Sequence, residues 1–372
     1  MIPVPAPSLV GCSTALRAAV DLARRFAPLF HPVLLVGPTG VGKSTLARLL
    51  HDWSGRAGDF VAVTGGELVD SLFHNQLFGH EKGSYTGATD QAPGVFERAA
   101  GGTLLLDELQ HWARDKQAAI LAPLQDARVT RVGGRRALPT TCRVVLASTI
   151  PLERLVKNDR LLPDLQYRIG DLVIELPPLS RRRVDVAVLA YHFLDLEREA
   201  GGSMVPAVFD PIALERMLVY KWPGNVRELQ RVVQYAIVRA AGQERVRVLD
   251  LPARVTTPKR LALWPTLTAD DRDALVAWAL ERVRGRRSSA AKMLGVHANT
   301  IDNYRKHLAA HASSQTTPDS ALAGVGPVVT GANRRNHRHK RQHTIPSRAR
   351  AAGVMPCDIR PAPTPTPMSE AG

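Results

Sequence analysis

The chain has 372 residues, a formal net charge of +15 and a sequence pI near 10.3, which predicts one to three domains and a polyanionic partner. It contains no apolar run approaching the roughly 20 residues that span a bilayer, no signal-peptide pattern at its start and only three widely spaced cysteines. We therefore expect no membrane partner and no disulfide framework, and we place the protein in a reducing bacterial cytoplasm.

The first predicted strand, Val33–Val36, leads directly into a segment that matches GxxxxGK[ST] from Gly37 to Ser44. Glycines let the backbone N–H groups of such a loop surround a triphosphate, and the helix that begins near Lys43 adds its positive dipole end. Lys43 is placed to reach the β- and γ-phosphates, and the Ser44 hydroxyl to bind Mg²⁺. The predicted ATP site consists of Gly37, Pro38, Thr39, Gly40, Val41, Gly42, Lys43, Ser44 and Thr45.

Three further apolar segments are predicted strands of the same parallel α/β sheet, namely Phe60–Val63, Thr103–Leu106 and Val144–Ala147. The second of them delivers Asp107 and Glu108 to the carboxyl edge of the sheet. We expect Asp107 to complete the Mg²⁺ shell and Glu108 to polarise an attacking water. The alternative is an ordinary solvated strand end.

The chain divides into five predicted regions by pattern and composition. An α/β ATPase subdomain over residues 1–180 is followed by a helical lid over 181–250, a linker over 251–266 and a small all-α domain over 267–311. Residues 312–372 are rich in Ser, Thr, Pro, Gly and Arg, so we predict a basic disordered tail. This tail is either attracted to DNA phosphates or has no function.

In the small all-α domain, a helix from about Ser288 to Leu294 is predicted to stop at Gly295, and a second helix to begin near Ala298. The pattern resembles a Fis-type helix-turn-helix; the alternative is a plain helical hairpin with a polar face. We expect two copies of this motif to bind two DNA half-sites as a dimer, and the preceding helix is a candidate dimer surface. The residues predicted to face DNA are His297, Asn299, Thr300, Asn303 and Lys306.

Five motifs in a fixed order resemble one family. The chain contains QLFGHEKGSYTGA, GGTLLLDE, RVGG, LPPLSRR and WPGNVREL, which are similar to successive motifs of the bacterial enhancer-binding proteins, the AAA+ activators of sigma-54 RNA polymerase. The resemblance covers roughly residues 8–240. It implies a P-loop sheet with a helical lid, assembled from dimers into a hexameric ring with ATP between subunits. It also implies that Arg168 is an arginine finger and that Arg227 is the second sensor arginine.

The GSYTGA segment takes the place of the family's GAFTGA loop, which contacts the sigma factor and moves with the nucleotide state. Without the family, the segment predicts only a surface turn. By resemblance, the residues that contact sigma-54 are Gly83, Ser84, Tyr85, Thr86, Gly87 and Ala88.

Several departures from the family pattern concern hydrolysis. Thr64 stands where the family has an asparagine, and Ser148 and Thr149 replace a Thr-Asn pair. Leu162 aligns with the family's first arginine finger, and Arg160 lies two residues away. Loss of a positive charge lowers the rate of phosphoryl transfer by orders of magnitude.

The sequence therefore predicts an ATP-dependent regulator that binds upstream enhancer DNA and remodels sigma-54 polymerase. The main alternative is a DNA-binding regulator that binds ATP but hydrolyses it weakly or not at all. A replication or chaperone ATPase is disfavoured by the combination of GSYTGA and helix-turn-helix. About ten residues precede the ATPase, so we expect no receiver domain and control by a separate regulatory protein, by expression level or by the tail.

Overall fold

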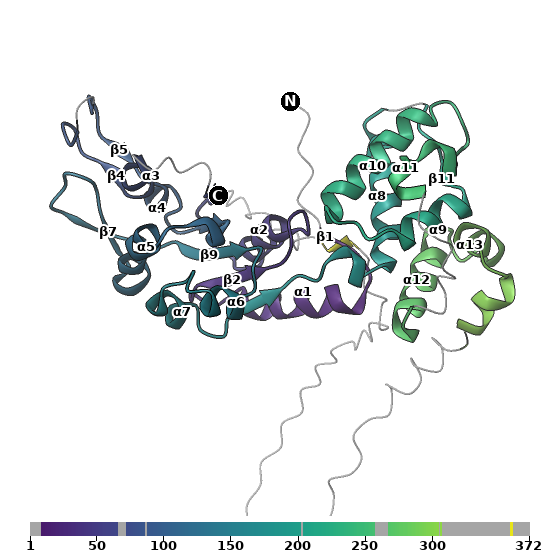
Figure 1. Cartoon of the computed structure of the whole chain (residues 1–372), viewed down its shortest axis with the longest axis horizontal. Helices are drawn as coiled ribbons and strands as arrows, with labels where there is room; N and C mark the ends of the chain where they lie inside the picture. The colour runs from purple at the N-terminus through teal and green to yellow at the C-terminus, as the bar shows by residue number, and fades with distance from the viewer. Residues whose placement is uncertain are drawn as a thin grey trace, which may run out of the picture.

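The structure of the protein is a computed structural model, which describes residues 9–65, 72–85, 88–201, 204–256, 267–304, 306 and 358–359. A five-stranded parallel sheet forms its centre (Figure 1), in the order β10-β2-β9-β6-β3. Its strands are β10 (Val173–Glu175), β2 (Val33–Val36), β9 (Arg143–Ser148), β6 (Thr103–Asp107) and β3 (Phe60–Thr64).

The four predicted strands are confirmed, with one or two residues added to three of them. The edge strand β10 was not predicted, because three residues with one terminal acid carry too little pattern. Successive residues of the central strands face opposite sides and are buried on both, as in other parallel sheets. Helices therefore cover both faces, and every loop that follows a strand emerges at one common edge.

The helices of the sheet domain lie in two layers. Those that pack on one face with the apolar side chains of Val33, Leu35 and Val145 are α1 (Thr14–Phe26) and α2 (Lys43–Trp53). Those on the other face are α3 (Phe73–Phe78), α4 (Val95–Arg98), α5 (Arg114–Asp126), α6 (Leu152–Lys157) and α7 (Pro163–Ile169).

Buried Arg143 fixes the end of α1. Its guanidinium donates to the carbonyl oxygens of Ala27, at 2.8 Å, and Phe26, at 2.6 Å. A positive charge at this end of the helix offsets the helix dipole. Burial lowers the pKa of Arg143 to about 10, so the side chain remains charged at neutral pH.

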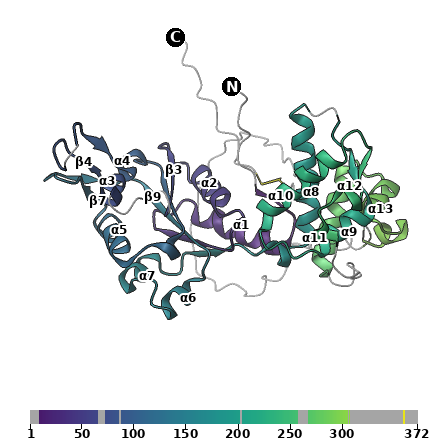
Figure 2. The ribbon, with the colours of Figure 1, turned by 45° about the horizontal axis from the view of Figure 1, so that its top comes forward.

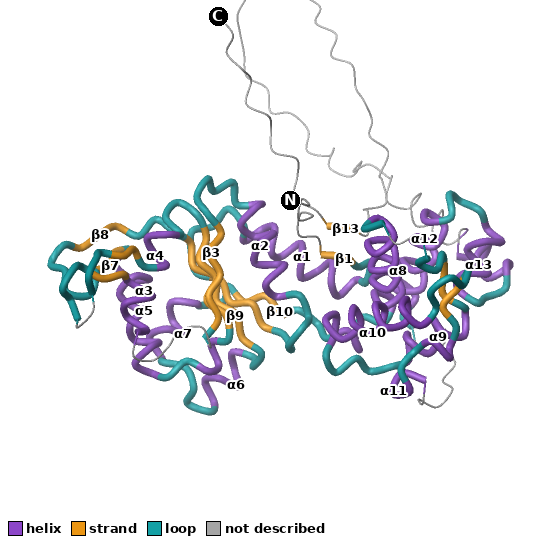
Figure 3. The backbone as a smooth tube through the Cα atoms, turned by 90° about the horizontal axis from the view of Figure 1, so that it is seen from above, coloured by secondary structure: helices purple, strands orange, loops and turns teal. Residues whose placement is uncertain are grey.

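Two short antiparallel hairpins project from the sheet domain at the end remote from the lid (Figures 1 and 3). One pairs β4 (Gly79–His80) with β5 (Ala92–Pro93), and the other pairs β7 (Arg128–Thr130) with β8 (Ala137–Pro139). The GSYTGA segment connects β4 to β5. The RVGG motif connects β7 to β8.

The lid is helical, as predicted, and carries one small parallel pair of strands. Its helices are α8 (Val184–Glu199), α9 (Pro211–Val219) and α10 (Asn225–Arg239), and its strands are β11 (Val208–Phe209) and β12 (Arg245–Val246). A further short helix, α11 (Ala253–Thr256), lies in the predicted linker over residues 251–266 and packs into the lid core through buried Val255. Single 3₁₀ turns within the described residues lie at Leu109–His111, Leu179–Arg181 and Val248–Asp250. Nowhere in the described part of the chain is a helix long and apolar enough to cross a bilayer.

The predicted DNA-binding region packs on the lid (Figure 2). Its helices α12 (Ala269–Arg282) and α13 (Arg287–Leu294) share one hydrophobic core with α8 and α9 through Leu275, Trp278 and Met293. Arg282 donates to both carboxylate oxygens of Asp195 at 2.6 and 2.8 Å. The apolar face of α12 that the sequence offered as a dimer surface is thus covered by the lid of its own chain.

The tail prediction needs one correction. Asp358–Ile359 form a short strand, β13, which pairs antiparallel with β1 (Leu9–Val10). The composition of residues 312–372 predicts no buried core, but main-chain pairing to an existing strand does not need one. The other residues after 306 lie outside the described part of the chain.

Candidate functional site

The carboxyl edge of the sheet brings together the loops that the sequence singled out. Val36 lies opposite Ser148 in the register of β2 and β9, and Thr64 lies opposite Asp107 in the register of β3 and β6. The GxxxxGK[ST] loop therefore adjoins the end of β9, and Asp107 adjoins the end of β3. The site is assembled from four strand ends that are distant in sequence.

The loop after β2 wraps around the Lys43 side chain. Lys43 is 7% exposed, and its Nζ donates to the carbonyl oxygen of Gly37 at 2.8 Å. Gly40 and Gly42 have φ values of 74° and 114°, in the left-handed region that favours glycine. Helix α2 begins at Lys43, so its free N–H groups point into the loop.

Asp107, the last residue of β6, is held by hydrogen bonds from the residues that follow it. Glu108 N–H donates to Asp107 Oδ1 at 2.7 Å, and Trp112 Nε1 donates to the Asp107 carbonyl at 3.2 Å. Glu108 has φ 60° and ψ 38°, a left-handed conformation that costs a non-glycine residue about 1–3 kcal/mol. Such strain is characteristic of active sites.

Charges from three elements converge on Lys43. Burial lowers the pKa of its ammonium, Asp107 and Glu108 act to raise that pKa, and Arg227 acts to lower it. Burial dominates, so the net direction is downward. A desolvated ammonium between two carboxylates and a guanidinium is an arrangement that a polyphosphate would complete.

Arg227 reaches this site because the WPGN turn of the lid rests on the P-loop. Asn225 adopts φ 50° and donates from Nδ2 to the Thr39 carbonyl at 2.9 Å. Val226 N–H donates to the Gly40 carbonyl at 2.9 Å. A Cβ on Gly40 would lie 2.5 Å from the Gly224 carbonyl oxygen, so this approach requires glycine.

A buried ion pair also joins the lid to the P-loop, and sequence analysis missed it. Arg182 donates to the Val41 carbonyl at 2.8 Å and lies 3.6 Å from Asp185 on α8. Asp185 in turn accepts the N–H groups of Cys12 and Ser13 at 2.7 and 2.8 Å. Both residues lie in or next to the LPPLSRR motif, whose sequence carries no signal for these long-range partners.

Ser148 and Thr149, which replace the family's Thr-Asn pair, both make local hydrogen bonds. The Ser148 hydroxyl donates to the Ile150 carbonyl at 2.8 Å and so stabilises the turn after β9. Thr149 N–H donates to Gln110 Oε1 at 3.0 Å. Gln110 thereby links the end of β9 to the turn after Glu108, a contact that the motif comparison did not reveal.

The three finger candidates differ in exposure. Arg160 and Arg168 are exposed, whereas Leu162 is half-buried and packs against the core beside α5 and α7. Buried Gln117 fixes this segment by donating to the Arg160 carbonyl at 2.8 Å and accepting from Leu162 N–H at 2.9 Å. The backbone therefore turns residue 162 inward and residue 160 outward.

The base of the GSYTGA loop is clamped by the RVGG hairpin. Arg131 ion-pairs with Glu97 and Glu81, and the pKa of Glu97 is lowered chiefly by its hydrogen bond from Arg131. A Cβ on Gly133 would lie 2.6 Å from Ser84 Cβ, so the hairpin needs glycine there. Of the predicted contact residues, Thr86 and Gly87 lie outside the described part of the chain.

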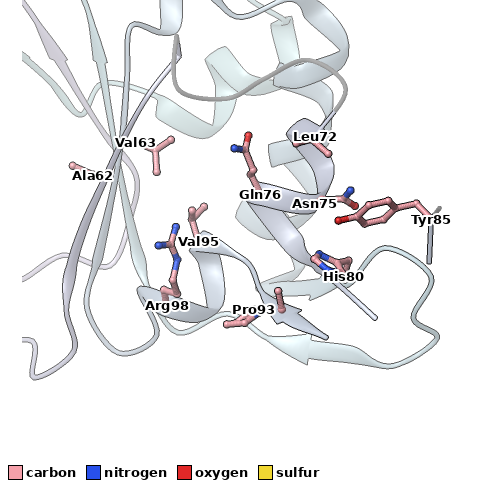
Figure 4. Close-up of a pocket in the computed structure, with 11 residues that line it drawn as sticks. Ala62, Val63, Leu72, Asn75, Gln76, His80, Tyr85, Pro93, Val95 and Arg98 are labelled. Carbon is pink, nitrogen blue, oxygen red and sulfur yellow. The ribbon is translucent and has the colours of Figure 1, made fainter. Parts of the chain in front are cut away.

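Tyr85 is the exposed aromatic residue of this loop. It is 40% exposed, and its ring stands edge-on to His80 with centroids 5.2 Å apart. Both side chains border a cavity of about 530 Å³ between α3, β3 and β5 (Figure 4). Ala88 is buried, and its N–H bonds the Tyr85 carbonyl at 3.0 Å, which closes the loop on itself.

The two predicted helices of the DNA-binding region are present. Helix α13 ends at Leu294 and is capped by Gly295, which has φ 66°, and residues 298–304 are helical. Ile301 on the second helix is buried, and Tyr304 is partly buried against it. Four of the predicted DNA-facing residues are exposed, namely His297, Asn299, Asn303 and Lys306, whereas Thr300 is half-buried.

A parallel sheet with a P-loop, a neighbouring strand that ends in Asp-Glu and a helical lid resting on the P-loop define an AAA+ ATPase fold. The family described as Sigma-54 interaction domain matches residues 9–175, and the AAA+ ATPase lid domain matches residues 180–262. The chain belongs to the family of sigma-54-dependent transcriptional regulators.

Individual relatives agree with this family. The chain is 36% identical over 301 residues to the transcriptional regulatory protein ZraR of Klebsiella oxytoca, covering 79% of this chain and 67% of the relative. It is 35% identical over 305 residues to the C4-dicarboxylate transport transcriptional regulatory protein DctD of Pseudomonas aeruginosa, covering 80% and 64%. The match thus spans about two thirds of each curated relative.

Solved structures show the same fold. The crystal structure of NtrX from Brucella abortus in complex with ATP superimposes with a TM-score of 0.60 at 28% identity, over 81% of this chain and 69% of that one. NtrX in complex with ADP gives a TM-score of 0.59 at 27% identity, covering 81% and 68%.

Proposed function

We propose that this transcription regulator binds and hydrolyses ATP at the carboxyl edge of its sheet, and uses the cycle to act on sigma-54 polymerase. The observation that carries the proposal is that buried Lys43, Asp107 at the end of β6 and the WPGN turn of the lid lie at this one edge. The resolved ATP complex of NtrX, a structural neighbour, supports ATP as the nucleotide.

The residues of the site fit a Mg²⁺–triphosphate. Lys43 Nζ donates to the carbonyl oxygens of Gly37 and Pro38, which β- and γ-phosphates would replace as partners. Ser44 follows Lys43 in the first turn of α2. Ser44 and Asp107 would hold Mg²⁺, which neutralises phosphate charge when bound. Glu108 would orient and polarise the attacking water, and Arg227 from the lid would sense the phosphates.

We further propose a ring in which Arg168 acts on the nucleotide of a neighbouring subunit. Arg168 borders a cavity with Pro32 and Cys142, which precede β2 and β9. These residues mark the amino edge of the sheet, whereas the P-loop follows its carboxyl edge. Arg168 is therefore remote from its own P-loop, and a catalytic role requires a second copy.

The GSYTGA loop is the proposed contact with sigma-54. It projects from the sheet domain at the end opposite the lid, and its exposed Tyr85 offers the aromatic anchor that interfaces favour. The predicted domain boundaries are part of this proposal, with the change that residues 267–304 are carried on the lid.

The rival function is a regulator that binds ATP but hydrolyses it negligibly. Leu162, Thr64 and Thr149 favour it, because each replaces a residue type that the family uses around the phosphates. Steady-state ATPase activity, measured across protein concentration with and without sigma-54, separates the two functions. Turnover at the level of background under all of these conditions would leave only the rival.

Arg160 and Leu162 provide a direct test of the finger assignment. Because residue 160 is turned outward and residue 162 inward, we expect Arg160→Ala to lower kcat without weakening ATP binding, and Leu162→Arg to gain little. Arg154→Ala, another exposed arginine of the same segment, is the control. A large gain in kcat from Leu162→Arg, with no loss of kcat from Arg160→Ala, would show that no arginine of this chain fills the first finger position.

We also propose that residues 287–306 bind enhancer DNA. Asn303→Ala should reduce the preference for a specific site over random DNA by about 1–3 kcal/mol. Lys306→Ala should weaken binding to all sequences alike and reduce the salt slope by about one. Fluorescence anisotropy at several salt concentrations distinguishes the two outcomes. If both variants lose affinity equally and independently of salt, the helix does not read DNA in this way.

A further inference from the structure

Strand β1 stands apart from the central sheet and has a partner from the far end of the chain. Leu9 pairs with Ile359, and Val10 with Asp358, in antiparallel register. Figure 3 shows β13 beside β1. Among the described strands, β1 pairs with no other, so without β13 its edge would be open.

This edge lies at the junction of the N-terminal strand, the P-loop and the lid. Leu9 is 5% exposed, and a Cβ on Gly42 of the P-loop would lie 3.1 Å from Leu9 Cδ1. The backbone after β1 is tied by Cys12 and Ser13 to Asp185 on α8. Arg182, the partner of Asp185, bonds the P-loop carbonyl of Val41. A strand that docks on β1 is therefore connected to the P-loop through these contacts.

The sequence around β13 suits a short, reversible docking segment. Pro356 and Pro361 flank the four residues 357–360, and proline has no N–H to continue a strand ladder. Pairing is thereby limited to a few residues. Two-residue antiparallel pairs are marginal on their own, so this contact is expected to form and release readily.

We propose that Asp358–Ile359 are a built-in ligand of the β1 edge, and that their docking steadies β1 against the P-loop and slows nucleotide exchange. The binding mode is addition of a strand through main-chain hydrogen bonds. The effect on exchange rests on the proposed ATP site, whereas the docking itself does not.

Docking is tested in the full chain by cross-linking. Directly opposed residues of an antiparallel pair have Cα atoms about 4.5–5.5 Å apart, within the range for a disulfide. Leu9→Cys with Ile359→Cys, in a chain that also carries Cys357→Ser, should form an intramolecular disulfide under mild oxidation, detected by mass spectrometry. Leu9→Cys with Thr366→Cys is the matched control. Equal yields for both pairs, or links only between chains, would overturn the proposal.

The effect on exchange is tested by release of a fluorescent ADP. Asp358→Pro with Ile359→Pro removes two main-chain donors and should accelerate release several-fold, whereas Ala351→Pro with Ala352→Pro should match the wild type. An unchanged rate in the first variant would refute control of exchange. If the wild type binds no fluorescent ADP, the ATP site proposal fails, and the cross-link still decides whether the segment docks.

Discussion

Replacing Glu108 with glutamine should leave ATP binding intact and reduce kcat by about 10²–10⁴-fold. The substitution keeps the shape of the side chain and removes its charge and basicity. Lys43, the proposed phosphate ligand, is unchanged in this variant, so the binding energy should remain. Single-turnover hydrolysis and equilibrium nucleotide binding, measured on the same preparation, give the two quantities separately.

The companion variant is Lys43→Ala, which should abolish nucleotide binding itself. Lys43 is the buried ammonium at the centre of the site, and removing it leaves the Gly37 carbonyl without its donor. The Glu108 role is rejected if Glu108→Gln turns over ATP at the wild-type rate. Loss of binding in Glu108→Gln would instead place that residue among the phosphate contacts.

The elements that sequence predicted well are those with a local pattern. Strand Val33–Val36 and the loop behind it are continuous in sequence, and so is the strand that ends at Asp107. Their meeting at one edge follows from parallel topology alone. Gly295 likewise predicted the end of α13, because its left-handed backbone is a local requirement.

The contacts that sequence could not predict join residues far apart in the chain. Asp185 bonds the backbone of residues 12 and 13, Arg131 clamps Glu97, and Arg282 fixes α12 to Asp195. The sequence has 49 basic and 34 acidic residues that could form such contacts. Which of them meet is decided by the fold and not by the local sequence. The docking of α12 on the lid follows the same rule, because an amphipathic helix does not specify which apolar surface covers it.

Arg168→Ala should retain ATP affinity and lose turnover by about 10³–10⁵-fold, since a guanidinium contributes mainly in the transition state. Because Arg168 lies near the amino edge of the sheet, the proposed ring assigns the lost group to a neighbour's site. Activity per protomer of the wild type should accordingly rise with concentration as rings form. Activity that stays constant where sizing shows only monomers would contradict a shared site.

Mixing two inactive variants tests the same geometry without relying on a rate constant. Lys43→Ala protomers lack a nucleotide site but keep Arg168, whereas Arg168→Ala protomers keep the site. In random mixed rings, roughly a quarter of the interfaces would pair an intact site with an intact arginine, so activity should reappear on mixing. Lys43→Ala mixed with Glu108→Gln is the control, because both changes damage the same P-loop site and no interface is complete. ATPase activity that recovers in the first mixture alone establishes catalysis across the subunit boundary. If native mass spectrometry shows mixed rings and neither mixture is active, Arg168 has no part in the mechanism.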